Sequence, residues 1–256
     1  MSEESAPINL THHFLIAMPG LEDESFSRSV VYLCEHSERG ALGLIINKPS
    51  KLSLQGLLQK VDLGLKRDDL RDQQVFTGGP VQTDRGFVLH EPMVIEGAPE
   101  NESAYASTMT IPGGLEMTTS KDVLEALSDG AGPKRVLVTL GYSSWDEGQL
   151  ESEIGENAWL TVEADPEVIF STPVEERYDR ALGLLGLGAL EVILPLLRPL
   201  VWGGVAAFLT HPLFAFLMRR TGGRHPGLCA TVTLGAALLF VLAPVSYLVT
   251  FLGQET

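Results

Sequence analysis

Short apolar runs alternate with charged or glycine-rich segments over the first 170 residues of the chain. The runs at 13–18, 29–34 and 41–46 are rich in β-branched and aromatic residues, which is typical of strands. The polar stretch 91–114 predicts a long surface loop with one edge strand. Further strands are predicted at 86–90, 136–140, 159–162 and 168–170.

Four segments instead carry helical signals. Leucines at helical spacing predict an amphipathic helix over 52–61. Thr119 precedes Asp122, and Ser144 precedes Glu147, at capping-box spacing, which predicts two helices. These helices cover 120–128 and about 146–156, and a last one begins at Pro173 and runs through Arg180. Strand runs mixed with single helices predict an α+β fold rather than a doubly wound sheet.

The character of the chain changes after Arg180, where three long apolar segments follow. They cover residues 181–197, 200–218 and 228–252, and the last contains no charged residue. A bilayer core needs about 20 consecutive apolar residues in a helix. Glu191 lies in the first segment, and Arg198-Pro199 separates it from the second. The pattern predicts an all-α membrane tail of two to three transmembrane helices.

The charges around these segments predict their orientation. Three arginines between residues 219 and 224 favour a cytoplasmic loop, because positive loops stay on that side. The acidic N-terminus lacks the basic start and apolar run of a signal peptide. Three crossings satisfy both observations. We therefore expect an inner-membrane protein, attached through residues 181–252, with its N-terminal domain in the cytoplasm.

Negative charge is concentrated in the first part of the chain. The whole chain has a net charge of −15, whereas residues 1–180 hold 31 acidic and 14 basic residues, a net of −17. Binding to nucleic acid relies on basic faces that neutralise phosphates. We therefore expect no direct contact with nucleic acid, and a protein partner whose identity the sequence does not indicate.

Residues of catalytic or metal-binding type do not form a recognisable pattern. His12, His13, Cys34 and His36 match no standard zinc spacing, and adjacent histidines in a strand point to opposite faces. The serines before Trp145 lack the G-x-S-x-G pattern of a nucleophile elbow. We expect no catalytic residue, no metal site and no cofactor.

One glycine-rich turn has two interpretations. Gly78-Gly79 is either a tight turn that needs positive φ or a place where the backbone can approach a ligand. Asp84 and Arg85 form either an ion pair that holds the loop or part of a groove with the segment after the third strand. The candidate ligand groove comprises Asn47, Lys48, Gly78, Gly79, Asp84 and Arg85.

Several stretches, in order and without gaps over about residues 8–187, resemble the YqgE/AlgH family. They are 14–20 (FLIAMPG), 28–36 (RSVVYLCEH), 43–49 (GLIINKP), 77–81 (TGGPV), 84–90 (DRGFVLH), 118–122 (TTSKD), 141–142 (GY) with Trp145, 148–151 (GQLE), and 153–154 (EI) with 157–160 (NAWL). Ser143-Ser144 departs from the family pattern, which usually has a smaller pair before the tryptophan. The resemblance implies an α+β fold with a bifurcated β-sheet folded into a pseudo-barrel with flanking helices. It implies no established activity and no catalytic residue. The family is bacterial and cytosolic, and has a proposed regulatory role in gene expression.

The tail is similar to the first membrane segments of the autoinducer-2 exporter (PerM-like) transporter family. The similarity rests on Leu197-Arg-Pro199, Arg219-Arg220 and Ala243-Pro244 with the apolar runs between them. We therefore expect two domains, a YqgE/AlgH-like domain over 1–187 and a transmembrane tail over 188–256. The join between them is open to interpretation as a fusion, a frameshift or a truncated gene.

Three functional hypotheses follow. The first is a non-enzymatic interaction or regulatory domain tethered to the inner membrane. The second is a fragment of a transporter that carries a cytosolic accessory domain. The third is a small-ligand sensor or an uncharacterised enzyme with the candidate groove as its site.

Overall fold

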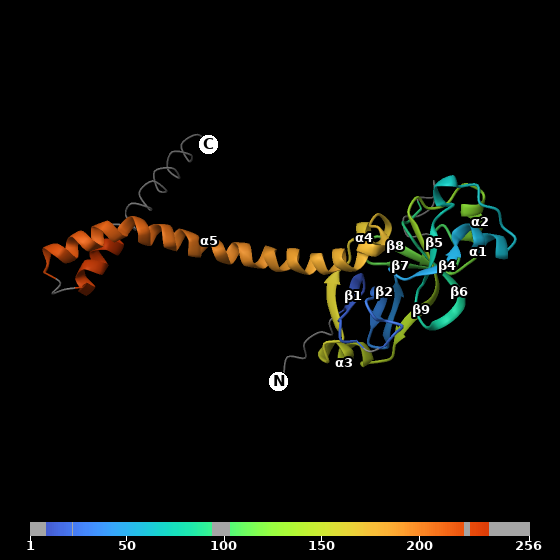
Figure 1. Cartoon of the computed structure of the whole chain (residues 1–256), viewed down its shortest axis with the longest axis horizontal. Helices are drawn as coiled ribbons and strands as arrows, with labels where there is room; N and C mark the ends of the chain where they lie inside the picture. Colours follow the sequence, from blue (N-terminus) through green and yellow to red (C-terminus); the bar gives the residue numbers. More distant parts are fainter. Residues whose placement is uncertain (1–8, 22, 94–102, 223–225, 236–256) are drawn as a thin grey trace. The chain divides into compact units, whose positions relative to one another are not determined.

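The computed structural model describes residues 9–21, 23–93, 103–222 and 226–235. The chain divides into two compact units, Met1–Leu187 and Gly188–Thr256. Among the described residues, all of the strands lie in the first unit (Figure 1).

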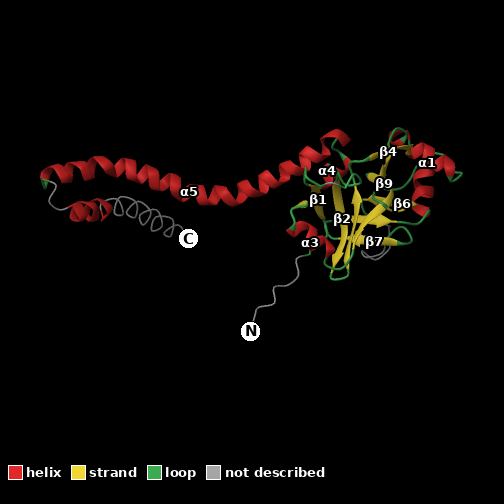
Figure 2. Cartoon of the chain, turned by 60° about the horizontal axis from the view of Figure 1, so that its bottom comes forward, coloured by secondary structure: helices red, strands yellow, loops and turns green. Residues whose placement is uncertain are grey.

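The first unit is built on a curled ten-stranded sheet (Figure 2). The strands are β1 His13–Ala17, β2 Val30–Ser37, β3 Gly40–Ile45, β4 Pro49–Ser53, β5 Gln74–Thr77, β6 Val81–His90, β7 Thr108–Ile111, β8 Leu115–Thr118, β9 Val136–Trp145 and β10 Trp159–Glu163. The predictions at 13–18, 29–34, 41–46 and 159–162 are confirmed, and the edge strand expected in the polar loop is β7. Strands β4 and β8 were not predicted.

The sheet branches at its longest central strand. Its main order is β10-β1-β2-β3-β9-β6-β8-β7, and β5 joins β4 to β9 outside this path. The second half of β9 pairs with β3 through residues 143–145, whereas its first half pairs with β6 through residues 136–140. All pairs are antiparallel except β5 with β9. This branching matches the bifurcated sheet that the family resemblance implied.

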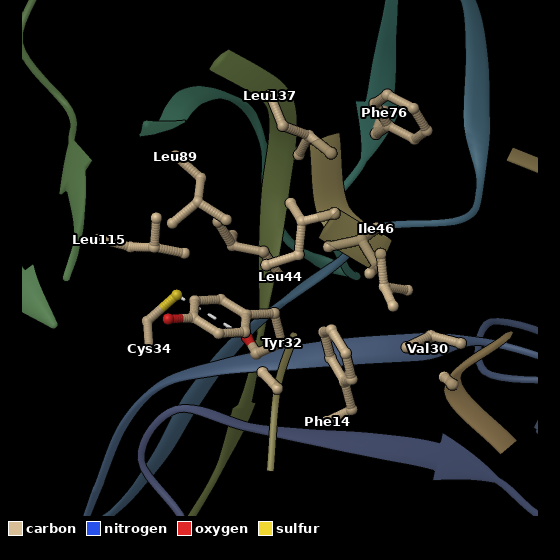
Figure 3. Packing of buried hydrophobic residues seen from close by; sticks show 14 of the residues in the cluster. Phe14, Val30, Tyr32, Cys34, Leu44, Ile46, Phe76, Leu89, Leu115 and Leu137 are labelled. Carbon is tan, nitrogen blue, oxygen red and sulfur yellow. Dashed lines mark hydrogen bonds between the residues drawn. The ribbon is translucent and has the colours of Figure 1, made fainter. Parts of the chain in front are cut away.

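Both faces of the first three strands are buried, which explains their continuous apolar runs. Phe14 and Ile16 belong to one apolar cluster, and Leu15 and Ala17 belong to another on the opposite face. Figure 3 shows the first cluster, in which Tyr32 packs beside Phe14 with side chains from β3, β6 and β9 nearby. A third cluster includes buried side chains of helices α1 (Leu54–Lys60) and α2 (Asp122–Ser128). The fold is α+β, as predicted.

Short helices cover the ends of the sheet (Figure 1). They are α1 Leu54–Lys60, α2 Asp122–Ser128, α3 Gln149–Gly155 and α4 Pro166–Phe170, with 3₁₀ turns η1 Asp68–Leu70 and η2 Val174–Glu176. Helix α5, Arg177–Arg220, continues into the second unit. The helices expected at 52–61, 120–128 and 146–156 are therefore present, with later starts.

Both predicted capping boxes are wrong. Helix α2 follows Lys121, which makes no side-chain cap, and Asp122 instead accepts a hydrogen bond from the backbone N–H of Ala106 at 2.7 Å. Ser144 lies in β9, where it pairs with Leu42, so it cannot cap α3. That helix begins after Gly148, whose φ is 72°. Long-range strand pairing outweighed the local capping signal in the second case.

The strand predicted at 168–170 is also wrong, because these residues belong to α4. The side chain of Asp165 accepts from the backbone N–H of Glu167, and Pro166 occupies the first helical turn. Both features favour a helix start. Val168 and Ile169 are fully buried in the first cluster. A short buried apolar run of this kind is thus compatible with a short helix as well as with a strand.

The two tail segments expected at 181–197 and 200–218 form one continuous helix, α5, so the predicted interruption at Arg198-Pro199 is wrong. In the described part of the chain, no helix is long and apolar enough to cross a membrane. The third predicted span, 228–252, extends beyond the described residues, of which 226–235 are helical. The side chain of Glu191 also lies outside the described part.

Candidate functional site

A surface groove of about 540 Å³ lies where the segment after β3 meets the turn between β5 and β6. Three of the six predicted groove residues line it, namely Asn47, Lys48 and Gly79. The other lining residues are Glu24, Ser25, Ile45, Pro49, Thr77, Pro80 and Thr83. We call this the Lys48 groove. Its volume is in the range of small-molecule sites, about 300–1,000 Å³.

Asn47 fixes one wall of the Lys48 groove. Its Oδ1 accepts from the backbone N–H of Val30, and its Nδ2 donates to the carbonyl of Arg28, both at 2.8 Å. These bonds hold the segment before β2 against the end of β3. Asn47 therefore has a positioning role, because both ends of its amide are already used.

Lys48 brings a positive charge to the groove. Its Nζ donates to the carbonyls of Glu24 at 3.1 Å and Ser25 at 2.7 Å, which fixes the loop 23–25. Burial lowers the pKa of Lys48, and the charge of Asp23 opposes that shift. An ammonium group has three donors, so one remains for a ligand oxygen.

The glycine turn is required by close packing against β9. A Cβ on Gly78 would lie 2.2 Å from the carbonyl oxygen of Gly141, and one on Gly79 would lie 2.2 Å from the backbone of Tyr142. Gly79 also has a φ of 156°. The backbone of Gly78 bonds to Ile45 and Leu140, and its carbonyl accepts from the hydroxyl of Ser143. Thus Gly78, which follows β5, is hydrogen-bonded to both β3 and β9, whereas Gly79 lines the groove.

Asp84 and Arg85 do not line the Lys48 groove. Both lie exposed on β6, and no ion pair joins them in the described part of the chain. Arg85 instead donates to Gln82 at 3.4 Å and to Thr119 at 3.2 Å, and it lies over the ring of Phe87. Both interpretations of the Asp84–Arg85 pair are therefore wrong.

The remaining lining residues were missed by the sequence reasoning, although several were adjacent to predicted ones. Thr77 and Pro80 flank the glycine turn, and Pro49 follows Lys48. Glu24 and Ser25 carried no local signal, since only the folding of their loop onto Lys48 brings them there. The groove thus combines one ammonium, one carboxylate, hydroxyl groups and the apolar side chains of Ile45, Pro49 and Pro80.

The histidines and the cysteine near β1 and β2 have structural partners. Nδ1 of His36 accepts from the backbone N–H of Leu10, so Nε2 carries the proton and donates to Glu151 at 2.9 Å. Cys34 is buried, and its thiol donates weakly to the carbonyl of Tyr32 (Figure 3). Burial raises the pKa of the Cys34 thiol, which disfavours the reactive thiolate. Over the described ranges, no cluster of three potential metal ligands occurs.

The fold and the groove define a class of protein: an α+β domain on a branched, curled sheet with an open surface groove. The model of the family described as DUF179, AlgH-like, matches residues 14–189. The chain belongs to this AlgH-like family. Relatives support the assignment: a UPF0301 protein of Delftia acidovorans is 84% identical over 187 residues, which cover 73% of this chain and 94% of that protein. A UPF0301 protein of Acidovorax sp. is 77% identical over the same shares.

Two solved structures resemble the chain. The solution structure of the AlgH protein from Pseudomonas aeruginosa is 45% identical, with a TM-score of 0.59, and the match covers 75% of this chain and 96% of that one. A crystal structure of a Corynebacterium diphtheriae protein is 20% identical, with a TM-score of 0.52, and covers 67% and 85% respectively. The second likeness concerns the fold alone. None of these matches supports the similarity of the tail to the transporter family.

Proposed function

We propose that the AlgH-like unit is a non-enzymatic regulatory domain that binds a small polar metabolite in the Lys48 groove. The observation that carries the proposal is the convergence of Lys48, Gly79 and two threonines on one cavity. The ligand has an anionic or carbonyl oxygen for the free donor of Lys48. It also has hydroxyl or amine groups for Thr77, Thr83 and Glu24.

The composition of the groove favours binding over catalysis. The described residues that line it include no histidine, cysteine or aspartate. No recorded hydrogen bond in this part of the structure joins one of its hydroxyl groups to a basic side chain. Nucleophilic catalysis needs such a pair. Occupancy of the groove would instead act on the loop 23–25, which Lys48 holds, and so change the surface offered to a protein partner.

A thermal-shift screen of the full chain tests this proposal. The panel contains amino acids, organic acids and nucleotides, and a true ligand is expected to raise the melting temperature. Lys48→Gln should lower the affinity for that ligand at least tenfold, because the substitution removes the free donor. Lys51→Gln, at an exposed position of β4, is the matched control. A panel in which every ligand found binds Lys48→Gln and the native chain equally would contradict the proposal.

We propose further that the second unit attaches the domain to the inner membrane. The support comes from large apolar side chains that are exposed in the described part of the tail, with Phe208 exposed by 80%. The others are Ile193, Leu194, Leu197, Leu213, Phe216, Leu228, Val232 and Leu234. Exposed apolar surface on this scale marks an interaction site. Cell fractionation tests the attachment: we expect the full chain in the membrane fraction and residues 1–187 in the supernatant. A full chain found in the supernatant would reject it.

A further inference from the structure

A second cavity, of about 470 Å³, lies in the first unit and shares no lining residue with the Lys48 groove. It is formed by η1 and β5, the start of β9, α4, η2 and the first residue of α5. Leu70, Phe76, Val136, Phe170 and Val174 give it an apolar lining. We call it the Arg177 cavity, after the buried cation in its wall.

Arg177 is the unusual residue of this cavity, because it is only 6% exposed. Its Nε donates to the carbonyl of Thr172 at 3.0 Å, and its Nη1 donates to the carbonyl of Ile46. The guanidinium lies 5.0 Å from the centre of the Phe76 ring. These contacts hold the side chain in one orientation.

The contacts of Arg177 do not neutralise its charge. No ion pair joins it to a carboxylate within the described ranges. Burial lowers the pKa of Arg177 to about 10, against the opposing effect of Glu175. A guanidinium has five N–H donors, and two of them donate to the carbonyls of Thr172 and Ile46. A buried charge is stable when it is paired, and arginine pairs best with a planar carboxylate through two parallel bonds.

A second polar group in the cavity wall needs a donor. Oε1 of Gln73 is buried without a hydrogen-bond partner, whereas its Nε2 donates to the carbonyl of Val136. An unpaired buried acceptor costs about 1–3 kcal/mol. A ligand for this cavity would therefore have a hydroxyl or N–H group as well as an anionic group.

The cations around the Arg177 cavity differ in whether a carboxylate already pairs with them. Arg135 is occupied by Glu91 at 2.7 Å and by Glu167 at 2.5 Å, so its charge is neutralised. Lys134 is exposed, and no ion pair is recorded for it among the described residues. Asp69 is paired with Arg67, whereas Asp72 also lines the rim and opposes an anion. Arg177 and Lys134 are thus the two cations available to a ligand.

We infer that the Arg177 cavity binds a small organic carboxylate with an apolar body and a hydroxyl or N–H donor. Its carboxylate pairs with Arg177 at the buried end and its apolar body packs on the Leu70–Val136–Phe170 lining. Its donor group bonds to Gln73. This site is separate from the Lys48 groove and does not depend on the function proposed for it.

The probe for this site is 4-hydroxybenzoate, which has all three features. The Nε–H group of Arg177 bonds to a carbonyl and gives an NMR signal that we expect to shift saturably during titration of the full chain. Benzoate, which lacks the donor, should bind at least threefold more weakly, and neutral 4-hydroxybenzamide at least tenfold more weakly. Inorganic phosphate should leave the signal unchanged, and saturable binding of phosphate would overturn the assignment to an organic carboxylate.

Variants locate the binding. Arg177→Lys should lower the affinity for 4-hydroxybenzoate at least tenfold. Lys134→Gln, on the exposed rim, should lower it about threefold. Arg180→Gln, one turn along α5 and exposed, is the matched control and should bind like the native chain. Lys48→Gln should also leave this affinity unchanged, which separates a failure here from a failure of the Lys48 groove. Should Arg177→Lys fail to fold, Lys134→Gln decides, because a native affinity in that variant would overturn the site.

Discussion

Glu153 shows how a single carboxylate can organise an apolar cluster. Its Oε2 accepts from the indole N–H of Trp145 at 2.9 Å and from that of Trp159 at 2.7 Å. The two rings meet edge to face, with centroids 5.8 Å apart, and both pack on Phe26. No local pattern in the sequence indicates that a residue of α3 accepts hydrogen bonds from both indole N–H groups.

Replacing Glu153 should therefore destabilise the fold. Glu153→Ala leaves two buried indole donors without their acceptor, and we expect a loss of about 2–4 kcal/mol in the free energy of unfolding. Urea denaturation followed by tryptophan fluorescence measures this loss. Glu147→Ala, at an exposed position nearby, is the control and should change stability by less than about 0.5 kcal/mol. Equal stabilities of the two variants would contradict this role of Glu153.

His90 predicts how stability depends on pH. It is buried on β6, with Nδ1 bonded to the carbonyl of Glu91 at 2.8 Å and Nε2 to the hydroxyl of Thr118 at 2.9 Å. Burial lowers its pKa below 6.5, although the bond to Glu91 and the charge of Glu116 act in the opposite direction. The pKa of His12 is also lowered, chiefly by burial.

The sign of the effect follows from linkage. Below about pH 6.5 the unfolded chain binds protons that the native state does not bind. The free energy of unfolding therefore falls as the pH falls. Each such histidine contributes up to about 1.4 kcal/mol per pH unit in that window. Urea denaturation between pH 7.5 and pH 5.5 should show the decrease, and His90→Gln should make it shallower. An NMR titration midpoint of the His90 ring at or above 6.5 would contradict this account.

At the scale of elements, β9 determines the architecture, because both branches of the sheet and the glycine turn depend on it. Its close contacts with Gly78 and Gly79 leave no space for a Cβ. Gly141, in β9 itself, has a φ of 74° and approaches the carbonyl of Gly79. These three glycines permit β5 and β6 to pass close to β9 where the sheet branches.

Gly79→Ala should therefore be strongly destabilising. The variant combines a strained φ with a clash against the Tyr142 backbone, and we expect a loss of at least about 2 kcal/mol. Gly86→Ala is the matched control on β6, because a Cβ there meets nothing within 4 Å. Thermal denaturation compares the two. A Gly79→Ala variant as stable as Gly86→Ala would show that the turn tolerates a side chain.

The sequence predicted elements best where local pattern and burial agree. Strands β1 to β3 are buried on both faces, so their apolar runs identify them directly. The sequence did not predict elements that depend on pairing with strands distant in the chain. Strand β4, with the sequence PSKLS, is polar and exists because it pairs with β5. The extension of β9 over Ser143 and Ser144 likewise depends on β3.

At the scale of the whole molecule, the family model matches residues 14–189, and most of the second unit, Gly188–Thr256, lies beyond them. The candidate site was predictable where it lies on quoted motif residues, as with Asn47, Lys48 and Gly79. Asp84 and Arg85 were misplaced, because alternation along β6 and the irregular pairing between Val81 and Gly86 decide where they point. Glu24 and Ser25 enter the site because their loop folds onto Lys48, and no local pattern predicts that contact.

The central claim is that the Lys48 groove binds the ligand of this protein. Mapping backbone amide shifts of the isotope-labelled full chain, titrated with the metabolite panel, tests it most directly. We predict that, for at least one metabolite of the panel, the largest shifts fall on residues 23–25, 45–49 and 77–83, and that they are lost in Lys48→Gln but kept in Lys51→Gln. A panel in which no metabolite moves these amides, or shifts there that persist in Lys48→Gln, would contradict the claim.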